Sequence, residues 1–109
     1  MKEINLPEQS YIRYEENGKT ITICTLRQKA LHMIGLDDYR HKPYRRHGKK
    51  YYRPYRNYFY GNDEELDSLV EAGYMDFIDG EKGKTYYFNR LGLDWLGEQI
   101  GVIIHDEID

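Results

Sequence analysis

The sequence predicts a single α+β domain in which two β-hairpins and three helices are joined by one long cationic connection. Apolar residues recur at intervals of three or four positions in three segments, which is typical of helices that cover a core. Two other segments alternate polar and apolar residues on either side of a turn sequence, which indicates β-hairpins. The chain has 109 residues, enough to bury a core without disulfides or a metal ion.

The first hairpin is expected over residues 10–24, after an N-terminal arm formed by residues 1–9. Two alternating segments flank the Asn-Gly pair at positions 17–18. This pair favours a type I′ turn because both of its residues can adopt a positive φ. In the second strand, Ile21 and Ile23 are expected to face the core, while the threonines between them face solvent.

Residues 25–35 are expected to form the first helix. Thr25 and Gln28 have the spacing of a capping box, in which each side chain satisfies a free amide at the helix start. The apolar residues that follow fall on one helical face, and Gly35 is placed to end the helix in the left-handed conformation.

The C-terminal half is expected to contain two helices with the second hairpin between them. Residues 63–73 carry acids in their first turn, where the helix dipole favours negative charge. Residues 74–88 hold two strand-like segments around a turn that contains two glycines, so they predict the second hairpin. Asn89 is expected to cap the last helix, and residues 101–109 are expected to add a short strand and an acidic tail.

Residues 39–60, which connect the first two helices, hold half of the positive charge of the chain and none of its negative charge. They contain eight of the sixteen Lys and Arg residues, seven of the twelve tyrosines and no acid. The rest of the chain has 8 basic and 19 acidic residues, a net charge of −11. The net charge of −3 is therefore the sum of a strongly basic segment and a strongly acidic remainder.

The proline and glycine residues of this connection argue against one long helix, because they interrupt it at positions 43, 48 and 54. A loop of this length without structure is unusual in a compact domain, so part of it should be packed. We expect residues 53–60 to be packed and residues 40–50 to be the mobile part. The side chains expected to lie partly in the core are Tyr55, Tyr58 and Phe59.

A segment of this composition is typical of a surface that follows phosphates. Lys and Arg neutralise phosphates and release counterions, and tyrosine rings stack on the bases of single strands. We therefore expect a non-enzymatic protein that binds the backbone of nucleic acid, with Tyr51, Tyr52 and Tyr55 as stacking residues. The candidate binding residues are Arg40, Lys42, Arg45, Arg46, Lys49, Lys50, Tyr51, Tyr52, Arg53, Tyr55 and Arg56, with Lys82 and Lys84 on the second hairpin.

Three alternatives to nucleic-acid binding stay open, of which the least favoured is a hydrolase or nickase. The same cationic segment could be presented to an acidic protein surface, as in a regulatory protein or an inhibitor of host defence. Alternatively, the tyrosines pack on the core and the cations balance an otherwise acidic molecule. Pairing of the basic segment with the acids of residues 63–73 in a second copy would permit a homodimer.

No catalytic constellation, metal-ligand spacing or phosphate-binding glycine loop stands out, so neither an enzymatic activity nor a cofactor is expected. His41 and His47 flank part of the basic run, where the neighbouring cations would repel a metal ion. The single cysteine, Cys24, fits a reducing compartment, and no apolar run approaches the roughly 20 residues of a membrane span. These features predict a soluble cytoplasmic protein.

The order of elements over roughly residues 26–100 resembles the back half of a winged-helix domain. The chain is also similar to small proteins encoded by phages and prophages, most of which have no assigned activity. The shared motifs are His-x-x-Gly-Leu at residues 32–36, Tyr-Arg-Asn-x-Phe at residues 55–59 and Leu-Val-x-x-Gly at residues 69–73. The resemblance implies a phage or mobile-element origin, the cytoplasm of the host as location, and a winged-helix-like core at residues 25–100.

The helix at residues 63–73 departs from a winged helix that reads DNA. It would be the helix placed in the major groove, yet it carries five acids and no Lys or Arg. Base readout generally relies on Arg, Lys, Asn or Gln, and phosphates would repel this helix. The expected nucleic-acid surface is therefore the basic segment at residues 39–60.

Overall fold

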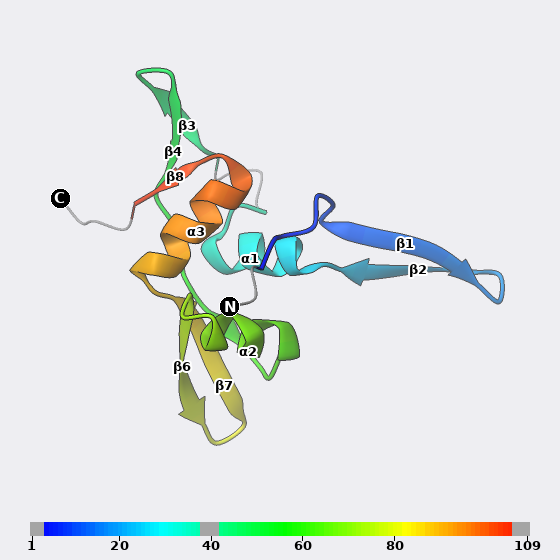
Figure 1. The fold of residues 1–109 in the computed structure, drawn as a ribbon. Helices are drawn as coiled ribbons and strands as arrows, with labels where there is room; N and C mark the ends of the chain where they lie inside the picture. The colour runs from blue at the N-terminus through cyan, green and yellow to red at the C-terminus, as the bar shows by residue number, and fades with distance from the viewer. Residues whose placement is uncertain (1–3, 38–41, 106–109) are drawn as a thin grey trace.

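The computed structural model describes residues 4–37 and 42–105, so Arg40, His41 and the end of the expected acidic tail lie outside the described residues. The described chain has an α+β fold with three helices and three small sheets (Figure 1), which confirms the predicted fold class. Within these two ranges, no helix is long and apolar enough to cross a membrane.

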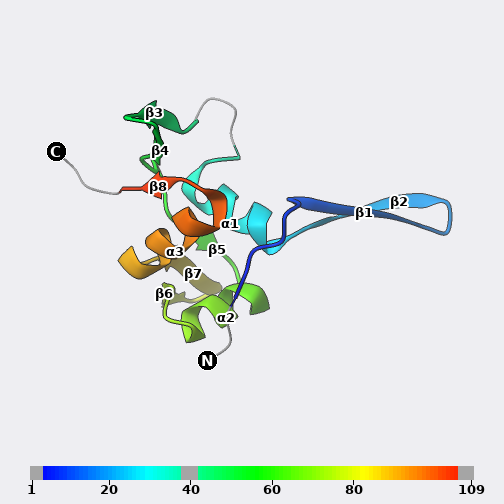
Figure 2. The ribbon, with the colours of Figure 1, turned by 45° about the horizontal axis from the view of Figure 1, so that its top comes forward.

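The first hairpin consists of β1 (Tyr11–Glu16) and β2 (Lys19–Cys24), paired antiparallel. Its turn follows the prediction, since Asn17 and Gly18 have φ values of 53° and 76°. Figures 1 and 2 show this hairpin, which we call the β1–β2 arm, extending away from the other elements.

The prediction that the isoleucines of β2 face the core is wrong. Ile12 and Ile23 lie opposite each other in the arm and are 48% and 46% exposed. The next apolar pair on that face joins Tyr14 to Ile21. The alternation of the sequence does produce one apolar face, but no other described element covers that face because the arm projects beyond the core.

Helix α1 (Leu26–Ile34) has its N-cap at Thr25, but the predicted capping box is wrong. The Thr25 hydroxyl turns back and donates to the carbonyl oxygens of Gln9 and Ser10, at 2.6 and 3.0 Å. Gln28 donates instead to the Asp37 carboxylate at 3.4 Å. The hydroxyl therefore ties the helix start to the base of the arm, while the C-terminus ends in a left-handed glycine, as predicted.

The C-terminal half contains α2 (Glu64–Glu71), β6 (Met75–Gly80), β7 (Gly83–Phe88) and α3 (Arg90–Ile100), as the sequence predicts. Both helices have side-chain caps. The Asp63 carboxylate accepts from two amides at the start of α2, and the Asn89 side chain accepts from the Gly92 amide at the start of α3. These caps explain why local sequence signals located both helix starts correctly.

One hydrophobic core lies between the three helices and the sheet formed by β7 and its neighbours. The N-terminal segment also contributes to this core, since Leu6 is buried and its amide donates to the Gln99 side chain at 2.8 Å. The fully buried large side chains are Tyr86, Met33, Ile34, Leu66, Leu69, Met75, Leu93 and Leu96.

Residues 40–50 were predicted to be mobile. Within this range, residues 44–50 belong to an additional short hairpin that the sequence analysis did not predict. Strands β3 (Tyr44–Arg46) and β4 (Lys49–Tyr52) pair antiparallel, and β4 pairs in parallel with β8 (Ile103–Ile104). The turn residues His47 and Gly48 both have a positive φ, 54° and 77°, as a type I′ turn requires. Residues 44–50 therefore form strands and a turn, while their mobility stays a prediction.

Residues 53–60 are packed, but not through the tyrosines that were expected to be partly buried. Tyr55 and Tyr58 are 50% and 55% exposed, whereas Phe59 packs against the core. Asn57 holds the segment to β7, because its amide donates to the Phe88 carbonyl at 2.8 Å and accepts from the Phe88 amide at 2.9 Å. The segment then ends in β5 (Phe59–Tyr60), which completes the sheet of order β5-β7-β6.

Candidate nucleic-acid interface

The β3–β4 hairpin, residues 44–52, which we call the basic hairpin, carries the most exposed cluster of cations. It stands at the end of the molecule opposite the tip of the β6–β7 hairpin (Figures 1 and 2). Its four cations, and the flanking Lys42 and Arg53, are all exposed. The four are Arg45, Arg46, Lys49 and Lys50.

The strand register places like charges directly opposite each other. Arg45 lies opposite Lys50, and Arg46 lies opposite Lys49. Such like-charge pairs across a sheet destabilise it. None of these four side chains makes a hydrogen bond or ion pair with any described residue, so no described acid neutralises their charge by direct contact.

The two pairs lie on opposite faces of the hairpin, since side chains alternate along a strand. The Arg45–Lys50 pair shares its face with Tyr52, which enters the core. The Arg46–Lys49 pair shares its face with the Tyr44–Tyr51 pair. Positive charge is therefore presented on both faces of the ribbon, beyond the point where it leaves the core.

An aromatic cluster braces one face of the basic hairpin. The rings of Tyr44 and Tyr51 stack with centroids 5.9 Å apart, and His105 meets both edge-on. The Tyr44 hydroxyl and the His105 Nε2 atom lie 2.7 Å apart. Because one side of the Tyr51 ring is covered by Tyr44, less of it is accessible to a base than the sequence suggested.

The structure places Tyr52 in the core, which corrects its assignment to the binding surface. The residue is 3% exposed, and its hydroxyl donates to the Ile34 carbonyl at the end of α1, at 2.8 Å. A ring in this position cannot stack on a base. Tyr52 therefore anchors the basic hairpin to α1.

Replacing Tyr52 with phenylalanine is expected to lower the free energy of unfolding by about 1 to 2 kcal/mol, because it removes the donor from a buried carbonyl. The measurement is urea denaturation followed by circular dichroism, beside Tyr51→Phe as a less buried neighbour. A loss no larger than that of Tyr51→Phe would mean that the buried hydrogen bond to Ile34 contributes little to stability.

Two of the predicted binding cations are occupied by partners inside the fold. Arg56 donates through Nε to the His32 carbonyl at 2.9 Å and lies 3.4 Å from the Asp37 carboxylate. Lys84 lies 3.1 Å from the Asp67 carboxylate. Their charge is largely balanced, in contrast to the cations of the basic hairpin.

The two lysines of the β6–β7 hairpin do not share a surface with the basic hairpin. Figures 1 and 2 show the two hairpins pointing in different directions from separate parts of the core. Lys82 is exposed at the tip of its hairpin, and Lys84 lies behind it in β7. The structure thus divides the predicted site into a coherent group at residues 42–53 and separate residues elsewhere.

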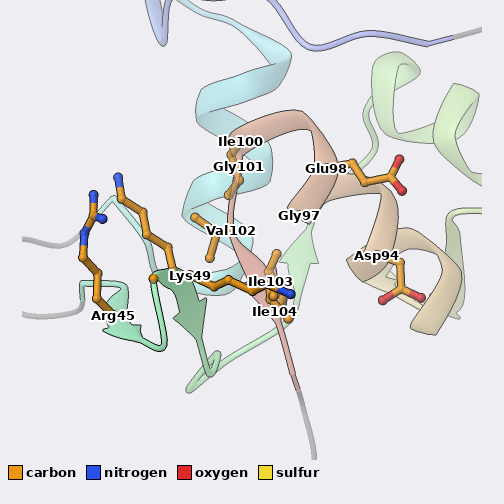
Figure 3. A pocket seen from close by; sticks show the side chains of 12 residues that line it. Arg45, Lys49, Asp94, Gly97, Glu98, Ile100, Gly101, Val102, Ile103 and Ile104 are labelled. Atoms are coloured by element: carbon orange, nitrogen blue, oxygen red, sulfur yellow. The ribbon is translucent and has the colours of Figure 1, made fainter.

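A groove of about 840 Å³ is lined by the basic hairpin, the C-terminal half of α3 and β8. Figure 3 shows Arg45 and Lys49 on one side of it and the carboxylates of Asp94 and Glu98 on the other. The C-terminal end of α3, at Gly101, also lines the groove, and a helix C-terminus carries partial negative charge. A phosphate chain is therefore favoured on the outer side and tip of the hairpin rather than inside the groove.

The acidic helix α2 finds its counter-charges elsewhere in the described chain. Asp63 and Glu65 pair with Lys29 of α1 at 2.7 and 2.8 Å. The Asp67 carboxylate accepts from the buried Tyr86 hydroxyl at 2.6 Å and pairs with Lys84. The described basic hairpin is left without these acids as partners.

The environment of Asp67 has a consequence for stability at low pH. The hydrogen bonds from Tyr86 and Lys84 lower the pKa of the Asp67 carboxyl below its ordinary value of 3.8. A lowered pKa in the folded state means that the charged form stabilises the fold above the ordinary pKa, and that this stabilisation is lost as the pH falls through the folded value.

We expect Asp67→Asn to be less stable than wild type at neutral pH, with the difference narrowing below about pH 4. Urea denaturation across a pH series measures it, with Glu71→Gln, an exposed carboxylate of the same helix, as the control. A stability difference that stays constant with pH would contradict the ionic contribution of Asp67.

Sequence reasoning missed Tyr44 and His105, which shape the outer face of the basic hairpin. Tyr44 was visible as part of the aromatic-rich segment, but only the pairing of β4 with β8 brings His105 beside it. Among residues 4–37 and 42–105, no group of three or more His, Cys, Asp or Glu side chains is placed to hold a metal ion. No protein-family model, curated protein or solved structure matches this chain.

Proposed function

We propose that this protein is a non-enzymatic binding protein that engages nucleic-acid phosphates through the basic hairpin. The observation that carries the proposal is that the hairpin holds two cross-strand pairs of cations, Arg45–Lys50 and Arg46–Lys49. These side chains form no ion pair with a described acid. The contact residues are Lys42, Arg45, Arg46, Lys49, Lys50 and Arg53.

Repulsion between the cations of the basic hairpin favours the binding of phosphates. Two unit charges about 5 Å apart repel by roughly 1 kcal/mol in water, and by more where solvent is partly excluded. Bound phosphates would turn this repulsion into attraction and release their counterions to solution. Cations scattered over a surface must be brought together when phosphates bind. The cations of the basic hairpin already lie on neighbouring positions of two paired strands.

We also infer that the core is winged-helix-like. If β3 and β4 are set aside as an insertion, the order α1, β5, α2, β6, β7 supports this inference, because β5 joins the later β6–β7 hairpin in one antiparallel sheet. The acidic helix α2 would not enter a groove of DNA in this protein. The nucleic-acid surface lies instead in the insertion between α1 and β5.

The three short motifs that suggest a phage or prophage origin have structural roles. Gly35 and Gly73 adopt φ values of 85° and 88° at the ends of α1 and α2. Asn57 joins its segment to β7 through two hydrogen bonds. We therefore propose that the motifs mark a shared core of phage type, and that the unmatched basic hairpin determines what this member binds.

The test is fluorescence anisotropy with labelled DNA and RNA of mixed sequence over about 50 to 200 mM salt. The wild type is compared with Arg45→Gln/Arg46→Gln/Lys49→Gln and with a control that removes three exposed cations elsewhere. The control variant is Arg13→Gln/Lys19→Gln/Lys82→Gln. Both variants change the net charge equally.

Wild-type affinity is expected to fall steeply with salt, and the hairpin variant should lose about 2 to 3 units of the logarithmic salt slope. The control variant should retain most of the slope. No binding by the folded wild type at low salt would reject the proposal and favour an acidic protein as the target. Equal losses in the two variants would show that only net charge matters.

A further inference from the structure

Resting on the proposed function, we propose that the target is B-form duplex DNA, and that the basic hairpin enters its major groove tip first as a two-stranded ribbon. Four features of the described structure carry this step beyond general phosphate binding. They are the dimensions of the hairpin, its two charged faces, the state of its tyrosines, and the position of the acids.

The dimensions of the basic hairpin match the groove. With β3 of three residues and β4 of four, the ribbon is about 10 Å long at roughly 3.3 Å per residue. The major groove of B-DNA is about 12 Å wide and 8.5 Å deep and admits a two-stranded ribbon. The tip is open at Gly48, since no described atom outside this glycine and its two chain neighbours lies within 4 Å of the position that a side chain there would occupy.

The two charged faces fit a groove with two phosphate walls. Arg45 and Lys50 point to one face of the ribbon, and Arg46 and Lys49 point to the other. In the major groove a ribbon lies between the backbones of both DNA strands, so each face meets phosphates. A single strand lying along the hairpin would contact one face and leave the other pair uncompensated.

The tyrosines of the hairpin are poorly placed for binding single strands. Proteins that bind single strands stack successive bases on exposed aromatic rings. Here Tyr52 is buried, and Tyr44 and Tyr51 stack on each other beside His105. The rings stiffen the ribbon instead of forming a row of stacking platforms.

The acids of the molecule restrict the direction of approach. Asp94 and Glu98 oppose a phosphate chain inside the groove beside α3, and α2 lies at the far end of the molecule from the basic hairpin (Figures 1 and 2). A tip-first approach keeps α2 away from the DNA and brings the tip of the hairpin, rather than the side of the groove formed by α3, to the DNA first. Duplex RNA is disfavoured because the A-form major groove is deep and narrow.

The experiment compares three labelled ligands of one sequence: duplex DNA, duplex RNA and single-stranded DNA. Two matched variants each remove one face, Arg45→Gln/Lys50→Gln and Arg46→Gln/Lys49→Gln. Duplex DNA should bind the wild type about tenfold more tightly than either other ligand. Each face variant should reduce the salt slope for duplex DNA by about 2, the value expected for two lost phosphate contacts.

A second arm identifies the groove. Duplex DNA carrying bulky glucosyl groups in its major groove should bind about tenfold more weakly, since the ribbon needs that space. Duplex DNA saturated with netropsin, which fills the minor groove, should bind as unmodified duplex does. Circular dichroism and thermal melting confirm that the variants are folded, and removing like-charge pairs should not destabilise them.

The outcomes separate this inference from the function on which it rests. Absence of binding to all three ligands at low salt overturns both. Equal or tighter binding of single-stranded DNA or duplex RNA overturns only the duplex ribbon, as does sensitivity to one face alone. Competition by netropsin without an effect of glucosylation would also overturn major-groove entry.

Discussion

Alanine in place of Gly92 is expected to destabilise the protein by about 3 kcal/mol or more, the range of severe overpacking. Gly92 is buried in the first turn of α3, where a Cβ atom would overlap the carbonyl oxygen of Tyr74. The same atom would lie 2.9 Å from Cδ1 of Phe88. The main obstacle is backbone, which cannot move aside as a flexible side chain can.

The expected change in stability is opposite to that of most Gly→Ala substitutions in helices. In an unobstructed helix, a change from Gly to Ala stabilises by roughly 1 kcal/mol. Urea denaturation should show the opposite for Gly92→Ala, with unfolding at a much lower midpoint concentration of urea than in wild type. The neighbouring Leu91→Ala, at a position 58% exposed, should change stability by no more than about 0.5 kcal/mol. A stabilised Gly92→Ala would show that α3 does not approach Tyr74 closely.

Trp95→Ala is expected to cost about 3 to 5 kcal/mol, as for other large aromatic truncations in a core. The indole is 8% exposed and stacks on Tyr74 with centroids 4.8 Å apart and an interplanar angle of 12°. Its Nε1 donates to the Ile4 carbonyl at 3.1 Å. The substitution thus removes both core volume and the attachment of the N-terminal segment.

Trp95→Phe separates these two contributions. Phenylalanine keeps a ring against Tyr74 but has no donor for the Ile4 carbonyl, so it should cost about 1 to 3 kcal/mol, less than alanine. Far-UV circular dichroism during urea denaturation measures both variants, since the only tryptophan is lost in each. A cost below about 1 kcal/mol for Trp95→Ala would mean that the N-terminal segment and the stack add little to the core.

Local chemistry made α2 and α3 predictable from the sequence. Asp63 and Asn89 cap their helices through their own side chains, and the apolar spacing of each helix faces the core directly. The same local reasoning failed at Thr25, because the hydroxyl finds carbonyl acceptors at the base of the arm that are 15 and 16 residues away in sequence. A cap can be predicted only when no tertiary partner competes for its side chain.

The basic hairpin escaped prediction because its strands lack an apolar alternation. Its turn, His47-Gly48, is a weaker signal than Asn-Gly, and β3 contains only Tyr and Arg. The hairpin is also held by β8, since Tyr51 and Tyr52 pair with Ile103 and Ile104 across about 50 residues of sequence. No local pattern reveals such a non-local pairing.

The candidate site was predictable in its charge but not in its composition. The sequence located the cations of residues 42–53, yet it could not show that Arg56 is engaged by His32 and Asp37. Nor could it show that Tyr52 is buried while Tyr58 is exposed, because both lie among many tyrosines. Partners in other elements decide which of these similar side chains remain available.

The β1–β2 arm leaves and re-enters the core at nearly the same place, since the Thr25 amide donates to the Ser10 carbonyl at 3.0 Å. The main path of the chain is thus already closed at the base of the arm, as at the site of an inserted segment. Adding or removing one opposed pair of residues would preserve the pairing of the two strands and move the tip by roughly 3.3 Å, and a change of two pairs would also preserve the face of each side chain. The reach of the arm can therefore vary by insertion and deletion while the packing of the three helices stays the same.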